Sequence, residues 1–213
     1  MIRVSKSSGI PDSLTTTRAY DGEDVKRQLL QDQHDKCYIC ERVGVTDFEI
    51  EHRRSKECCP ELRQDWNNLF LSCRYCNGKK LQNFDNTLDP LSVNIEDEIE
   101  QNIDYENKKA VFIPKNVTES HSETVKLLDR VFNGTGNLRK IKEERFFEYF
   151  LSVMNRFQGL LINYLGDATL DNENAVRDEL AIDKEFLGFK YWVIKNNTFL
   201  EATFGDCIIW NKA

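Results

Sequence analysis

The chain has 213 residues, with 29 lysines and arginines against 36 aspartates and glutamates, and a formal net charge of −7. It has no apolar run of membrane-spanning length and no apolar stretch after Met1 typical of a secretory signal, so we exclude a membrane protein and expect a cytoplasmic one. A chain of this size can bury its own core, and seven cysteines, an odd number, argue against a disulfide framework in that compartment.

The part of the chain before Cys37 predicts one helix. Residues 1–20 show no apolar period, and we expect an extended arm there. Asp21 is a suitable N-cap for a short helix that places Val25 and Leu29 on one face.

Two Cys-x-x-Cys pairs follow, Cys37 with Cys40 and Cys73 with Cys76. Zinc binds four thiolates tetrahedrally, and two residues between paired cysteines let a tight turn direct both sulfurs at one ion. We therefore predict a structural four-cysteine zinc site, with unliganded thiols or an iron–sulfur site as the alternatives. Four thiolates leave no open coordination position, so this zinc is expected to hold the fold and not to take part in catalysis. The other cysteines are not expected to be ligands: Cys58, Cys59 and Cys207.

A polar cluster is spaced around these pairs. Glu51 and His52 end an alternating, strand-like segment, Asn68 precedes a leucine, and Asn77 directly follows the second pair. This pattern resembles the HNH (ββα-metal) endonucleases, whose signature runs from an acidic residue and a histidine at a strand end, through an asparagine before a leucine, to a histidine or asparagine opening a helix. The resemblance covers about residues 36–81.

The resemblance implies a role for each of these residues. His52 would be the general base that deprotonates the attacking water, because a neutral imidazole suits that task near neutral pH. Glu51 and Asn77 would bind the catalytic divalent cation, and their hard oxygen atoms suit Mg²⁺ or Mn²⁺. Asn68 would steady the loop and keep the histidine aimed. Glu51 departs from the more common aspartate, and Asn77 from the more common histidine, which favours Mg²⁺ or Mn²⁺ over softer metals.

Basic residues are concentrated in the same region, although the whole chain is acidic. Residues 52–80 carry seven basic and three acidic side chains. Arg53, Arg54, Lys79 and Lys80 are therefore predicted to contact nucleic-acid phosphates, with DNA as the expected substrate. A solvated charged surface is the alternative interpretation of these residues.

The remainder of the chain predicts mainly helices. Residues 83–114 read as a connector with a strand at 111–113, followed by a helix that starts at Thr118 or Ser120 and stops near Gly134. A long amphipathic helix then runs to about Gly166, another covers 172–180, and the tail is ambiguous. The predicted class is α+β: residues 1–105 form an arm and a zinc-stapled ββα-metal nuclease domain, and residues 106–213 a mainly helical domain.

Outside residues 36–80 the chain has 20 basic and 29 acidic side chains, so this part is expected to repel DNA and to dock a protein partner. It resembles, more loosely, the helical extension of HNH proteins of Septu and retron-associated antiphage systems, in which the nuclease works with an ATPase. The matching segments are 37–41, 51–56, 65–69 and a stretch near 124–145. The resemblance implies an antiphage effector with an ATPase partner. A non-catalytic zinc-knuckle module that binds nucleic acid or protein, and an RNase toxin, are the alternative functions.

Overall fold

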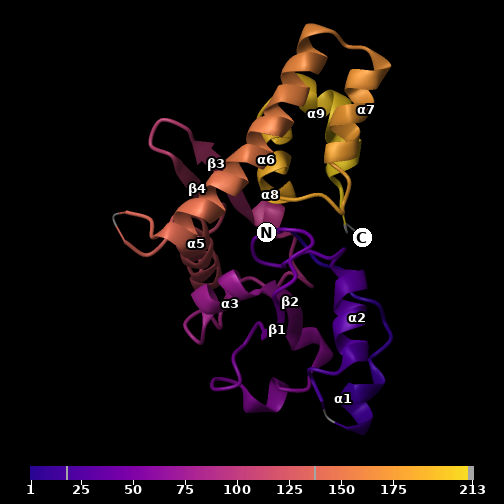
Figure 1. Ribbon diagram of the computed structural model, residues 1–213, viewed down its shortest axis with the longest axis vertical. Helices are drawn as coiled ribbons and strands as arrows, with labels where there is room; N and C mark the ends of the chain where they lie inside the picture. Colours follow the sequence, from indigo (N-terminus) through magenta and orange to yellow (C-terminus); the bar gives the residue numbers. More distant parts are fainter. Residues whose placement is uncertain (18, 137, 211–213) are drawn as a thin grey trace.

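The computed structural model describes residues 1–17, 19–136 and 138–210, and within these ranges it combines helices with two small antiparallel sheets (Figure 1). The α+β class is confirmed. In chain order the elements are α1 (Asp12–Thr16), α2 (Glu23–Asp32), β1 (Phe48–His52), β2 (Leu69–Cys73), α3 (Arg74–Lys80), α4 (Ile95–Glu98), β3 (Ile99–Asp104), β4 (Lys109–Pro114), α5 (Glu119–Phe132), α6 (Ile141–Gly166), α7 (Leu170–Glu179), α8 (Leu187–Lys195) and α9 (Thr198–Phe204).

The first sheet and α3 form a ββα unit. β1 and β2 pair antiparallel, with Phe48 opposite Cys73 and His52 opposite Leu69. Side chains alternate across a strand, so Leu69 and Leu71 pack with residues of α2 while Phe70 joins the main core on the other face. With both faces covered, all five residues of β2 are buried.

The second sheet lies where the boundary between two domains was expected. β3 and β4 pair along their whole length, from Ile99 with Pro114 to Asp104 with Lys109. A boundary between residues 105 and 106 falls in the turn of this hairpin, and one hydrophobic core continues from Met1 to residues of the last helices. The nuclease-like part and the helical part therefore share a core.

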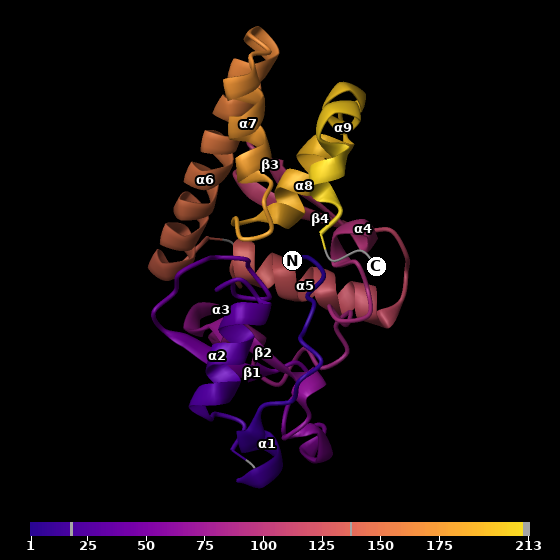
Figure 2. The ribbon, with the colours of Figure 1, turned by 90° about the vertical axis from the view of Figure 1, so that its right-hand side faces the viewer.

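The C-terminal helices are explained by their apolar patterns. The apolar face of α6 buries a row of phenylalanines, and α7 packs beside it. The ambiguous tail contains α8, a helix buried on nearly all sides, which is why its sequence shows no amphipathic period. α6, α7 and α9 extend together to the end of the molecule opposite α1 (Figure 2). Within the described ranges no helix has both the length and the apolarity needed to cross a bilayer.

The expected extended arm is only partly extended. It contains α1, whose Ser13 donates its backbone N–H to the Asp24 carboxylate over 2.9 Å. This contact fixes α1 against α2. The N-cap of α2 is Gly22, so the prediction that Asp21 occupies this position was wrong by one residue.

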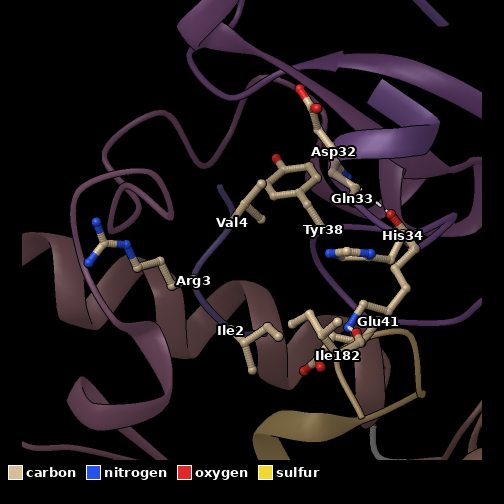
Figure 3. Close-up of a pocket in the computed structure, with 11 residues that line it drawn as sticks. Ile2, Arg3, Val4, Asp32, Gln33, His34, Tyr38, Glu41 and Ile182 are labelled. Atoms are coloured by element: carbon tan, nitrogen blue, oxygen red, sulfur yellow. Dashed lines mark hydrogen bonds between the residues drawn. The ribbon is translucent and has the colours of Figure 1, made fainter. Parts of the chain in front are cut away.

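The start of the arm crosses the centre of the molecule. Figure 3 shows Ile2 and Val4 passing beside Tyr38 of the first cysteine turn, with Ile182 close by. These residues enclose a cavity of about 20 Å³, which is room for about one water molecule. Val4 also donates its backbone N–H to the Pro90 carbonyl over 2.8 Å.

A buried charge cluster joins three regions at this point. The Met1 ammonium lies 2.6 Å from Glu41 Oε1 and 2.9 Å from Gln101 Oε1. Glu41 also accepts the backbone N–H groups of Leu187 and Gly188 over 2.8 and 3.1 Å. A side chain at Gly188 would collide with Gln101. Burial acts to raise the pKa of Glu41, but the Met1 ammonium, Lys36 and the Gly188 N–H together outweigh burial and hold this pKa below its ordinary value.

Candidate functional site

The four cysteines of the two pairs form one cluster. Their Sγ atoms all lie within 4.8 Å of one another, and the Sγ atoms of Cys40 and Cys73 are 3.9 Å apart. Tetrahedral zinc with Zn–S bonds of about 2.3 Å separates its sulfurs by about 3.8 Å, so the cluster fits zinc. Burial raises the pKa of the Cys40 and Cys76 thiols, and thiolates buried this deeply require a cation. Cys37, Cys40, Cys73 and Cys76 are the residues that would hold it.

The local fold explains why these sulfurs meet. Cys73 ends β2 and Cys76 lies in the first turn of α3, so a strand-to-helix turn places the second pair. The first pair lies in a turn closed by the Cys37 N–H, which donates to the Arg42 carbonyl over 3.0 Å. Tyr38 donates its backbone N–H to the Leu71 carbonyl of β2 over 3.0 Å, which holds the two turns together.

His52 is the last residue of β1, and its ring is oriented by the loop that follows. Its Nε2 lies 3.0 Å from the Arg63 carbonyl oxygen. Because a carbonyl can only accept, Nε2 carries the proton and the neutral ring keeps its lone pair on Nδ1. The residue is 5% exposed, and this burial lowers the pKa of His52. His52 is therefore a neutral base with one free nitrogen near neutral pH.

Asn68 closes the loop that carries the Arg63 carbonyl. Its Oδ1 accepts the backbone N–H of Arg54 over 2.8 Å, and its Nδ2 donates to the carbonyls of Arg54 and Leu62 over 3.0 and 3.3 Å. The side chain is buried and satisfied at both ends. The side chain therefore ties the two sides of the loop together, and its role in aiming His52 stays a prediction.

Glu51 forms an ion pair inside the ββα unit. Its Oε1 lies 2.8 Å from Nζ of Lys80, which is fully buried and also donates to the His52 carbonyl over 3.0 Å. Burial raises the pKa of Glu51, and Lys80 acts in the opposite direction. Lys80 was expected to contact phosphate, but the structure places its ammonium behind the strand, away from the surface.

Asn77 faces β1 from α3. Its Nδ2 donates to Oε2 of Glu49, which leaves the carboxamide Oδ1 as the available acceptor. Glu49 was not predicted as a site residue. The signal was present, because Glu49 is two residues before Glu51 and side chains at this spacing share one face of a strand.

One cavity brings together three of the four residues expected in the catalytic centre, and Asn68 does not line it. Glu51, His52 and Asn77 all line a cavity of about 220 Å³, together with Lys56 and Glu57. The neighbourhood combines a neutral base, a carboxylate and an amide oxygen. This is a donor set that suits a hard divalent cation and hydrolysis.

The other three predicted phosphate contacts, Arg53, Arg54 and Lys79, do not line this cavity. Arg53 donates to the Thr87 carbonyl over 3.0 Å and lies 3.5 Å from Asp89. Arg54 is half-buried in the loop held by Asn68, and Lys79 is paired with Glu143 of α6. The structure does not bring the four predicted phosphate contacts onto one surface.

Comparisons with known proteins agree with this geometry. Residues 37–82 match the HNH endonuclease family model. This HNH segment contains both cysteine pairs and every residue expected in the catalytic centre.

The chain is also similar to two Septu proteins. It is 41% identical to the Septu protein PtuB of Bacillus thuringiensis over 59 residues, which are 26% of this chain and 23% of that protein. It is 32% identical to the Septu protein PtuB of Bacillus mycoides (strain KBAB4) over 94 residues, 37% of this chain and 32% of that protein. The chain thus matches less than a third of the length of these relatives.

Proposed function

We propose that the chain is a metal-dependent HNH endonuclease that hydrolyses phosphodiester bonds, with DNA as substrate. The observation that carries this proposal is the His52 ring, which the Arg63 carbonyl holds with Nδ1 unprotonated in the cavity shared with Glu51 and Asn77. A histidine with a merely structural role would not need a carboxylate and a carboxamide in the same cavity.

Each residue of the candidate site has its own role in hydrolysis. His52 Nδ1 accepts a proton from a water molecule as its oxygen attacks phosphorus, and the bond from phosphorus to the leaving oxygen breaks. Glu51 and Oδ1 of Asn77 would hold Mg²⁺ or Mn²⁺, which when bound relieves the charge on the phosphate and leaving oxygen. Asn68 acts through the loop, since it donates to the carbonyl of Leu62, the residue before the Arg63 carbonyl that orients His52. The zinc site only holds the ββα unit together.

The biological setting proposed is prokaryotic antiphage defence with a protein partner, an ATPase. Similarity to the Septu proteins supports the setting. The charge of the helical part supports docking: α7 begins with Asp171 and Glu173, and exposed apolar side chains lie near it, 69% exposed at Ile162 and 70% at Leu170. Acidic residues around exposed apolar ones are typical of a protein-binding surface.

The test of the nuclease is plasmid cleavage with Mg²⁺ or Mn²⁺ by wild type, His52→Ala and Asn77→Ala. Loss of a general base is expected to slow cleavage about 10²–10⁴-fold. Asn83→Ala, at an exposed position just beyond α3, is the matched control and is expected to cut as wild type does. Circular dichroism and zinc content check folding. Active-site variants that fold and cut normally would falsify the assignment, and RNA tested in parallel separates an RNase.

A further inference from the structure

A large groove lies on a different face of α3 from the one that lines the candidate site. It has a volume of about 1040 Å³ and runs between the first cysteine turn, α3 and the N-terminal part of α6. Figure 2 shows the start of α6 close to α3, although the two are far apart in sequence. We call it the basic groove, after the basic residues that line it: Arg42, Arg74, Lys79, Lys140, Lys142 and Arg145.

The acidic residues of the groove do not cancel this charge. Only Asp47 and Glu143 line it among the described residues, and Glu143 is 2% exposed. Glu143 accepts from Lys79 Nζ and, over 2.7 Å, from the backbone N–H of Lys140. The negative charge of Glu143 is therefore compensated by partners inside the protein and is not exposed to solvent.

Three of the cations are available to a ligand. Lys140, Lys142 and Arg145 are exposed, and none of them forms an ion pair with any residue in the described ranges. They lie within the first turns of α6. Positive charges that line a concave surface focus the electric field there and attract a polyanion.

The floor of the groove is rigid. The rings of Tyr75 and Phe146 stack with centroids 4.7 Å apart, which holds α3 against α6. The guanidinium of Arg42 lies over the Tyr149 ring, 4.8 Å from its centroid. The two helices that carry most of the charges are thus packed against each other beneath the groove, which lowers the entropic cost of binding.

The groove is adjacent to the candidate site. Arg74 and Gly78 share the face of α3 that lines the groove, and Asn77 lies on the next face of the same helix. The Glu49 carboxylate joins the two, because one oxygen accepts from Asn77 and the other lies 3.9 Å from Nε of Arg74. A chain of phosphates that enters the cavity can continue into the groove.

We propose that the basic groove binds the sugar–phosphate backbone of the nucleic-acid substrate next to the scissile phosphate. This inference rests on the proposed nuclease function and adds the path of the substrate. It also revises the expectation that the C-terminal part repels DNA, since three of the groove's cations belong to that part. Among the described residues Glu143 is the one acidic residue of that part that lines the groove, and it is buried.

The test is a binding measurement with the zinc-loaded chain in a His52→Ala background, which prevents cleavage. Fluorescence anisotropy follows binding of labelled duplex DNA, single-stranded DNA and RNA of one sequence over a series of salt concentrations. Lys142→Glu/Arg145→Glu is compared with Lys108→Glu/Lys126→Glu, which changes the charge equally at exposed positions outside the groove.

The groove pair is expected to weaken binding at least about tenfold, and to reduce the salt dependence for duplex DNA by about two counterions, since each phosphate contact contributes about 0.9 to the slope. The control pair is expected to change the affinity less than about twofold, because distant charges are screened. Equal effects of the two pairs would overturn the proposal. The proposal would also be overturned if the parent chain bound none of the three nucleic acids. That result is expected if the groove binds an acidic protein instead.

The same variants separate the groove from the nuclease. In one outcome, the chain with native His52 cleaves DNA and Lys142→Glu/Arg145→Glu binds and cleaves DNA as well as the parent chain does. This result refutes substrate binding in the groove and leaves the proposed nuclease function standing. If binding depends on the groove but the chain with native His52 cuts no nucleic acid with Mg²⁺ or Mn²⁺, the nuclease is refuted and the groove stands as a binding surface.

Discussion

Lys80 reaches Glu51 through the interior of the ββα unit, with 2.8 Å between Nζ and Oε1. The helix that follows the second cysteine pair therefore supplies Asn77 to the cavity on one face and a buried counter-charge to the strand on another. The carboxylate proposed to bind the catalytic cation is held in place before any cation arrives.

Replacing Lys80 by methionine is expected to destabilise the fold by roughly 3–5 kcal/mol, because it leaves the Glu51 charge buried without a partner. Urea denaturation measures the loss. The double variant Lys80→Met/Glu51→Leu removes both charges and should regain much of the stability. A single variant as stable as wild type would show that the pair is not buried as described.

Asn68→Ala is expected to cost about 1–3 kcal/mol, because buried backbone groups of the loop lose their partners. Cleavage should fall roughly 10–100-fold at the same time, since the carbonyl that orients His52 is no longer fixed. Asn67→Ala, an exposed neighbour in the same turn, is the control and should affect neither quantity. Stability loss with unchanged cleavage per folded molecule would contradict a positioning role.

The pH dependence of cleavage should report His52. Burial lowers the pKa of His52, so its neutral form persists below the ordinary histidine value of about 6.5. The rate is therefore expected to rise with pH, with its midpoint below that value, and to level off above it. Burial raises the pKa of Glu51, so protonation of this carboxylate adds to the loss on the acid side.

Single-turnover rates measured across pH test this expectation. Imidazole added to His52→Ala should restore part of the activity and move the midpoint up to that of free imidazole. A wild-type midpoint above the ordinary histidine value would argue against His52 as the base.

Removing the zinc should unfold the ββα unit. Structural zinc contributes about 10–16 kcal/mol of apparent binding free energy in zinc-finger peptides, more than a small domain's whole stability. Cys73→Ser is expected to abolish stoichiometric zinc in elemental analysis and to reduce the circular dichroism signal. Cys207→Ser, at a cysteine outside the cluster, should retain one zinc per chain. Iron in place of zinc would refute the metal assignment.

Much of the candidate site could be predicted because its signals are local. The two-residue spacing of the cysteines predicted the cluster, and the order of Glu51, His52 and Asn77 around the second pair predicted the cavity residues. Position within a helix could also have shown the burial of Lys80, which is four residues after the buried Cys76 and therefore on the same face.

The remainder depends on tertiary contacts. The buried helix α8 has no amphipathic period to detect, because the core surrounds it. Charge sums along the sequence hid the basic groove, since Lys142 and Arg145 are counted with an acidic half but lie in space beside Arg74. The partner of His52 is a backbone carbonyl, which no residue type can reveal.

The contacts of Glu41 couple the first cysteine turn to the start of α8. This residue follows Cys40 directly, and its carboxylate holds the backbone of Leu187 and Gly188 at the start of α8. The first turn of α8 cannot shift without either breaking these bonds or moving the peptide next to a zinc ligand. Val43 adds a second link, because its backbone N–H donates to Glu185 just before α8 over 2.9 Å. A protein that binds α8 and displaces it would thus shift the first cysteine turn as well.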